Sequence, residues 1–174
     1  MAYNFHQELV YLGTQTASAA ASVSFTTGIS SNFVNYLVKI RDITTSIPNN
    51  GILLTFSTNG GSSYLATNYK ANIAMNGTAL DNDSSTTSIF VDVDETGTST
   101  NQGNADVVMY NLSNSQVKTV YTFGGAFQNF SSIVATRNGV GVQTGTTAVN
   151  AIKFAGNGGA NMTAKFYLYG IQEP

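Results

Sequence analysis

Paired carboxylates are the first groups in this sequence that could do chemistry. Asp92 and Asp94 stand two residues apart in a run that alternates apolar and polar side chains, so we expect both on one face of a strand. A glycoside hydrolase needs two carboxylates about 5–10 Å apart, and Asp106 would have to line the same cleft. A solvent-facing strand that discourages edge pairing explains the same two residues. We favour this second interpretation, because few aromatic residues accompany the acids.

Nucleophilic catalysis requires a hydroxyl or thiol beside a positioned base. The only histidine is His6, near the start of the chain, and cysteine is absent. The Gly-x-Ser-x-Gly elbow of the serine hydrolases does not occur in the sequence. We therefore predict no catalytic residue and no enzymatic activity.

A calcium site is the best metal hypothesis that the acids allow. Asp81, Asn82, Asp83 and Ser84 place oxygen-bearing side chains in a row, and Ca²⁺ prefers six to eight oxygen ligands. The remaining positions of an EF-hand loop are missing, and Asx residues at this spacing often make turns by bonding their own backbone. The sequence predicts no metal site and no cofactor, with calcium as the minor alternative.

Tyrosines are the candidates for a surface that meets a partner or a ligand. Exposed aromatic rings on a rigid sheet can stack on sugars, and the same rings are common in the core of protein interfaces. The pattern leaves both interpretations open for six residues: Tyr64, Tyr69, Tyr110, Tyr121, Tyr167 and Tyr169. A glycan could also be contacted by two polar segments expected to be long surface loops, residues 76–88 and 95–106.

The composition excludes several classes of protein. The chain has 174 residues, with 7 basic and 9 acidic side chains, and only 9% of its residues are charged, against roughly 25% in an ordinary soluble domain. The weak charge predicts no nucleic-acid partner and no membrane-surface partner. No apolar run reaches the ~18 residues of a membrane helix, and the start of the sequence does not resemble a secretory signal.

Threonine, serine and asparagine form most of the polar surface. They number 22, 17 and 19, which is one residue in three. Hydroxyls and amides make a surface that is weakly charged and adheres to other polar surfaces. This composition favours a secreted β-protein, a lectin-like module or a component of a virus particle over a metabolic enzyme.

Hydrophobic residues recur with period two, which is the pattern of half-buried strands. The clearest alternating runs cover residues 23–25, 36–40, 52–57, 89–94, 107–110, 117–123, 130–136, 152–154 and 162–169. Five Asn-Gly pairs, at 50–51, 59–60, 76–77, 138–139 and 157–158, are strong hairpin signals. We predict an all-β protein, an antiparallel β-sandwich of about ten strands and jelly-roll type, with an N-terminal arm over 1–8 and a single domain over 9–174.

Three stretches of the sequence resemble small β-sandwich proteins of tailed-bacteriophage particles. The first is a Ser/Ala-rich opening over 14–29, followed by 35–38. The second is the segment 52–64, which ends in Ser-Thr-Asn-Gly-Gly-Ser-Ser-Tyr and is followed by 67–69. The third is the closing strand 164–171, which ends in Leu-Tyr-Gly-Ile. The resemblance extends from about residue 9 to residue 171. It is a pattern of strands and turns without a catalytic signature.

The resemblance implies a structural part of a virion. A head decoration (cement) protein, a head fibre, or a tail-fibre or baseplate module would each fit, and a chain without a long attachment region favours a small component copied many times. The implied partners are further copies of the chain, with a trimer favoured, and the major capsid or tail proteins of the same particle. The implied location is the virion, assembled in the host cytoplasm.

Two other classes remain open. A receptor- or glycan-binding β-sandwich module would use the exposed tyrosines and the loops, with a host-surface glycan as its partner. A polysaccharide hydrolase would require Asp92, Asp94 and Asp106 to line one cleft. Composition alone does not separate the virion part from the binding module, and only the resemblance favours the former.

Overall fold

The computed structural model describes residues 8–47, 50–75, 78–91, 103–128 and 133–172. Within these residues the chain forms twelve strands and one short 3₁₀ turn, Asn157–Gly159, and it contains no α-helix. Every strand pairing in this part of the chain is antiparallel. No helix there is long and apolar enough to cross a membrane. The prediction of an all-β antiparallel fold is confirmed.

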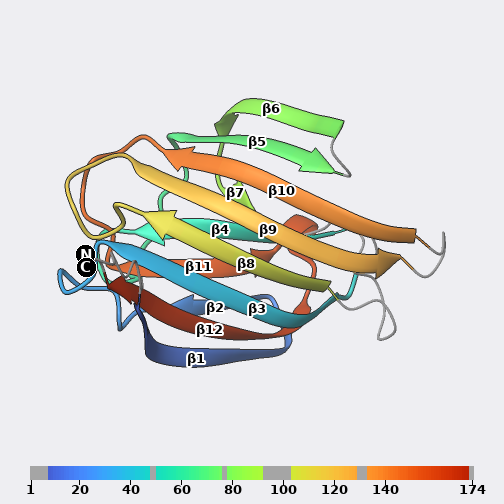
Figure 1. The fold of residues 1–174 in the computed structure, drawn as a ribbon, viewed down its shortest axis with the longest axis horizontal. Helices are drawn as coiled ribbons and strands as arrows, with labels where there is room; N and C mark the ends of the chain where they lie inside the picture. Colours follow the sequence, from blue (N-terminus) through green and yellow to red (C-terminus); the bar gives the residue numbers. More distant parts are fainter. Residues whose placement is uncertain (1–7, 48–49, 76–77, 92–102, 129–132, 173–174) are drawn as a thin grey trace, which may run out of the picture.

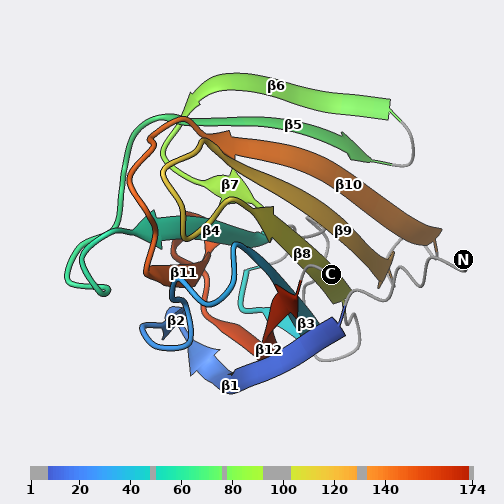
Figure 2. The same cartoon turned by 60° about the vertical axis from the view of Figure 1, so that its left-hand side comes forward.

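The strands form two sheets that pack face to face (Figure 1). The large sheet has the order β1 (Glu8–Ala20), β12 (Met162–Gln172), β3 (Asn35–Thr45), β8 (Gly103–Tyr110), β9 (Lys118–Gln128), β10 (Ile133–Gln143), β5 (Tyr69–Met75) and β6 (Thr78–Thr86). The small sheet has the order β2 (Ser22–Phe25), β11 (Ala151–Gly156), β4 (Ile52–Ser57) and β7 (Ile89–Phe90). Figure 2 shows the large sheet arching from β6 to β1, with the small sheet inside the arch.

The strand order is that of a jelly roll with two added hairpins. β1 pairs with β12, β2 with β11, β3 with β8 and β4 with β7, which is the ladder of one long hairpin rolled into a sandwich. The hairpins β5–β6 and β9–β10 are inserted into this ladder and widen the large sheet. The expected antiparallel β-sandwich is confirmed, with twelve described strands in place of about ten.

The alternating pattern of each strand sets the core. On β3, Tyr36, Val38 and Ile40 are fully buried between the sheets, and Leu37 and Lys39 point to the other face. Phe154 on β11 and Phe166 on β12 join the two sheets, with ring centroids 5.2 Å apart. One continuous cluster of buried apolar side chains fills the sandwich. Lys118, at the start of β9, is a fully buried charged side chain that is not part of this cluster.

Most of the Asn-Gly pairs are not hairpin turns. Only 76–77 joins two strands that pair with each other, since Met75 is the register partner of Thr78. The pairs at 50–51, 59–60 and 157–158 lie in crossings between the two sheets, and 138–139 lies inside β10, opposite Phe123 and Thr122. An Asn-Gly pair indicates that the backbone can adopt a positive φ angle. A loop that crosses between the two sheets can need this freedom as much as a hairpin turn does.

Two segments expected to be irregular form strands. Residues 78–86 of the predicted loop 76–88 are β6, which pairs with β5 along its length. Residues 103–106 of the predicted loop 95–106 open β8, and 95–102 lie outside the described residues. Of the predicted N-terminal arm 1–8, only Glu8 is described, and it begins β1 opposite Gln172.

Candidate interaction surface

The six candidate tyrosines fall into three different environments. Tyr69 is fully buried, so the expectation that it faces a partner or ligand is wrong. It is the first residue of β5, and its side chain points between the sheets, where its ring lies 6.0 Å from that of Phe56. Its hydroxyl accepts a hydrogen bond of 2.8 Å from the Phe56 N–H. Burial, partly offset by this bond, raises the pKa of Tyr69 to about 12.

Tyr64 lies in the loop between β4 and β5 and is half-buried. The ammonium of Lys153 lies 4.3 Å from the centre of its ring, within the range of a cation–π contact. The loop itself is held by its own side chains, because the Ser57 hydroxyl accepts from the Gly61 N–H at 2.9 Å and the Asn59 carboxamide oxygen accepts from the Ser63 N–H at 3.0 Å. Tyr64 thus belongs to a rigid crossing loop, away from the other tyrosines.

The other four tyrosines lie on the outer face of the large sheet. Consecutive cross-strand partners make a row of apolar and aromatic side chains over six strands, which we call the outer row: Tyr11, Tyr169, Leu37, Val108, Tyr121 and Val140. Directly opposed residues on one face lie about 4.5–5.5 Å apart, so such a row packs side chain against side chain. Tyr11, Tyr121 and Val140 of this row are exposed, and Leu37 in its middle is buried. The exposed apolar side chains on either side of Leu37 are candidate interaction surfaces.

The outer row has an exposed end at the sheet edge. Leu9 and Tyr11 on β1 are 45% and 57% exposed, and Tyr11 meets Tyr169 edge to face at 5.8 Å. Together with Tyr167 they form what we call the contact edge: Leu9, Tyr11, Tyr167 and Tyr169. β1 is also the last strand of the large sheet. Over its 13 residues it carries one charge, Glu8, and no lysine or proline, the residues that usually protect a sheet edge from pairing.

A second aromatic cluster lies near the middle of the same face. Tyr110 on β8 and Tyr121 on β9 are 37% and 38% exposed, with ring centroids 5.8 Å apart and ring planes at 90°. They border an open hollow of about 510 Å³, which is also lined by Val108, Asn111, Thr119 and Phe123. Phe123 is 51% exposed.

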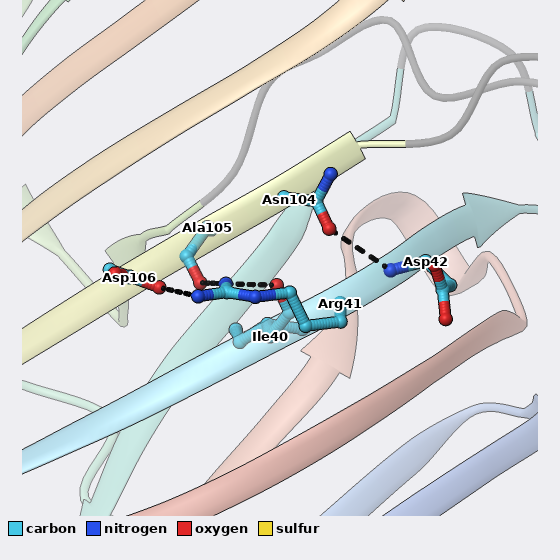
Figure 3. Close-up of polar contacts among 6 residues, drawn as sticks. All are labelled: Ile40, Arg41, Asp42, Asn104, Ala105 and Asp106. Atoms are coloured by element: carbon cyan, nitrogen blue, oxygen red, sulfur yellow. Dashed lines mark hydrogen bonds and ion pairs between the residues drawn. The ribbon is translucent and has the colours of Figure 1, made fainter.

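Phe123 also borders a second hollow of about 430 Å³, which we call polar because five of its eight lining residues have polar side chains. Its floor is an arginine that crosses from β3 to β8 (Figure 3). The Nη1 atom of Arg41 donates to the carbonyls of Ile40 and Ala105 at 2.9 and 3.0 Å. Its Nη2 atom lies 2.7 Å from Oδ1 of Asp106. Asn104, Thr136 and Asn138 complete the polar lining.

A β-bulge in β3 lies directly beside Arg41. The register of β3 shifts between Ile40 and Ile43 against β8, and Asp42 has φ of +57°. The Asp42 N–H donates to Oδ1 of Asn104 at 3.3 Å (Figure 3), and its carboxylate lies 3.8 Å from the Lys165 ammonium. β-Bulges commonly re-aim a side chain in this way, and here the side chain beside the bulge is Arg41.

The predicted acidic sites receive little support from the described residues. Asp92, Asp94 and His6 lie outside them, and the same is true of the side chains of Asp81 and Asp83. Asp106 is paired with Arg41. In the part of the chain that the structure describes, no three His, Cys, Asp or Glu side chains gather where they could hold a metal ion. The sequence matches no protein-family model and no curated protein.

Sequence reasoning missed Tyr11, Phe123 and Arg41 as members of this surface. The alternation of β9 already places Phe123 on the same face as Tyr121, so this residue could have been found. Arg41 could not, because its partners Ala105 and Asp106 are more than sixty residues away along the chain. The structure also separates the tyrosines into two clusters, which the sequence did not indicate.

Proposed function

We propose that this protein is a non-enzymatic structural component of a virus particle. A capsid decoration (cement) protein of a tailed bacteriophage, or a small fibre or tail-associated protein, is the form that best fits the resemblance of its sequence. The observation that carries the proposal is the contact edge, an exposed aromatic cluster beside an edge strand in a jelly roll. Jelly rolls recur in viral capsid proteins, but a fold by itself does not establish a role.

The contact edge has the chemistry of a surface that is covered in an assembly. Tyrosine and leucine bury large apolar areas, and tyrosine is enriched in interface cores. Lys39 borders it, with its ammonium 5.8 Å from the centre of the Tyr169 ring. The hydroxyl and amide side chains that make up most of the polar residues of the chain lose less on leaving water than lysine or glutamate would. The partners are further copies of this chain, with a trimer favoured, and the major capsid or tail proteins of the particle. Many modest contacts repeated over a particle add by multivalency.

The first experiment is the mass of the purified protein in solution, measured by light scattering after size exclusion. The double variant L9S/Y11S removes the exposed part of the contact edge. We expect the native protein to associate and this variant to be monomeric. Val140→Ser is the matched control, because Val140 is 39% exposed on the same sheet but lies at the other end of the outer row.

The second experiment is mass spectrometry of purified particles of the virus whose genome encodes the chain. We expect the protein in stoichiometric amounts, reduced or lost when the genome carries the L9S/Y11S change. Purified particles that lack the native protein would contradict the proposal. The proposal would also be contradicted if the L9S/Y11S variant were incorporated as fully as the native protein and had the same mass in solution.

A further inference from the structure

Two hollows on the outer face of the large sheet share one wall, and the proposed structural role uses neither. Phe123 borders both the apolar hollow beside Tyr110 and Tyr121 and the polar hollow over Arg41 and Asp106. We call the two together the Phe123 groove. Its lining residues come from β3, β8, β9 and β10 and from Asn111 after β8, and the buried side chain of Leu37 lies between Val108 of the groove and Tyr169 of the contact edge.

The apolar half of the groove offers faces and edges of aromatic rings. Tyr110 and Tyr121 stand perpendicular to each other, so one of the two rings presents an edge where the other presents its face. Tyr121 and Phe123 are same-face neighbours on β9, and such neighbours lie about 6.5–7 Å apart. Asn111 and Thr119 add an amide and a hydroxyl at the rim.

The polar half offers hydrogen-bonding groups whose positions are already fixed. Three contacts hold the Arg41 guanidinium in place, two with the carbonyls of Ile40 and Ala105 and one with the Asp106 carboxylate. A guanidinium has five N–H groups, so donors remain beyond the three contacts that the described residues make. The Arg41 and Asp106 side chains are 34% and 39% exposed, and both are accessible from the hollow. Asn138 adds an amide that both donates and accepts.

The charges in the groove select the class of ligand. Arg41 is neutralised by Asp106 at 2.7 Å, so the groove offers no net charge to a phosphate, sulfate or carboxylate. A lipid would leave the polar half without partners, and burying such groups unpaired is costly. A ligand is needed that has apolar ring faces and, along the same chain, hydroxyls that donate and accept. A neutral oligosaccharide has both.

We infer that the Phe123 groove binds a neutral oligosaccharide. One sugar ring stacks on Phe123, a neighbouring ring lies against Tyr121 and Tyr110, and the hydroxyls of the chain bond to Arg41, Asp106 and Asn138. The volumes of about 510 and 430 Å³ fall in the usual range for small-ligand sites, and each accommodates roughly one or two rings. Because the groove is open and shallow, a polysaccharide on a cell surface could lie along it as well as a free chain.

The test is binding of the full chain to a panel of neutral hexasaccharides built from glucose, mannose, galactose or N-acetylglucosamine, followed by amide chemical shifts in NMR. We expect at least one probe to bind with a dissociation constant in the micromolar to millimolar range, and to shift amides of β8 and β9. Phe123→Ala should weaken that binding about tenfold or more, and Asp106→Asn should weaken it as well. Both side chains are solvent-exposed, so thermal unfolding should confirm that the variants are folded.

The matched control is Tyr11→Ala, which removes an equally exposed aromatic ring from the contact edge. It should leave sugar binding unchanged, and Phe123→Ala should leave the mass in solution and the incorporation into particles unchanged. The groove and the contact edge can therefore fail independently. The inference is overturned if none of the neutral probes binds, or if a bound probe is insensitive to Phe123→Ala. Tighter binding of an oligogalacturonate than of the neutral galactose probe would also overturn it.

Discussion

Two buried polar side chains, Tyr36 and Lys118, bond to the backbone of the loops that precede their own strands. The Tyr36 hydroxyl donates to the Ser30 carbonyl at 2.7 Å and accepts from the Ser30 N–H at 2.9 Å, so it anchors the loop before β3. The Lys118 ammonium, at the start of β9, donates to the carbonyls of Asn114 and Gln116 and closes the loop after β8. Burial raises the pKa of Tyr36 and lowers that of Lys118. These two side chains add polar anchors to loops that also place Ile29 and Leu112 in the core.

Stability should decline at alkaline pH because of buried tyrosine. Tyr69 keeps its proton in the folded state until about pH 12, and in the unfolded chain it ionises near pH 10. The unfolded state therefore binds fewer protons between these values, and the free energy of unfolding should fall by about 1.4 kcal/mol per pH unit from this residue. Tyr36, whose pKa is also raised, adds to the decline. Below about pH 9 neither residue should cause any pH dependence.

Urea unfolding followed at about pH 9 and about pH 11.5 would measure this decline. Tyr69→Phe should be less stable than the native protein at the lower pH, because the Phe56 N–H loses its acceptor. Its stability should nevertheless fall less steeply as the pH rises. Equal slopes for the native protein and the variant would show that Tyr69 does not cause the alkaline loss.

At the scale of the elements, β10 of the large sheet packs closely against β7 of the small sheet. A side chain at Gly141 would place its Cβ atom 2.6 Å from Cγ2 and 2.8 Å from Cγ1 of Ile89. Ile89 is 1% exposed, so it is enclosed by the core. The absence of a side chain at Gly141 is thus what allows the short strand β7 to pack under the inserted hairpin β9–β10.

Gly141→Ala should destabilise the protein by about 1–3 kcal/mol, the usual cost of overpacking a core. Ile89→Ala removes the clashing atoms, so the double variant should be more stable than the sum of the two single changes predicts. The control is Gly13→Ala on β1, where nothing lies within 4 Å of the added Cβ. Chemical denaturation of the four proteins measures the coupling. Additive effects would mean that β7 shifts to make room.

On the scale of the whole molecule, one face of the sandwich carries both proposed activities. The outer face of the large sheet presents the contact edge at β1 and β12 and the Phe123 groove at β8 and β9. The two share the outer row, in which Leu37 is only 9% exposed and separates the clusters. A subunit that docks on the edge can therefore leave the groove open to a ligand.

Association through the contact edge should be insensitive to salt. Its four side chains are uncharged, the neighbouring Lys39 contacts it through the face of the Tyr169 ring at 5.8 Å, and the chain as a whole has a formal net charge of only −2. Raising the salt from about 0.1 M to about 1 M shortens the Debye length from about 10 Å to about 3 Å, which weakens an ionic interface but not an apolar one. Light scattering at the two salt concentrations should give the same mass. Dissociation at high salt would place the contact on charged residues instead.

Much of this fold follows from local patterns. Alternation in 36–40, 52–57 and 162–169 identifies strands and their buried faces, because side chains on a strand point to opposite sides with period two. The same pattern put Tyr110, Tyr121, Tyr167 and Tyr169 opposite the core. It did not reveal β6, whose sequence TALDNDSST has little apolar alternation, and it misassigned Tyr69.

The sequence by itself determined that the chain is an all-β sandwich with a weakly charged, hydroxyl-rich surface, since both depend on composition and on spacing within a strand. Only the tertiary structure decided which strands are neighbours. Arg41, Asp106 and Phe123 come from β3, β8 and β9, and they meet because the register across those strands is set by packing of the shared core. Contacts between residues so distant in sequence depend on how all the strands pair, and no local pattern carries that information.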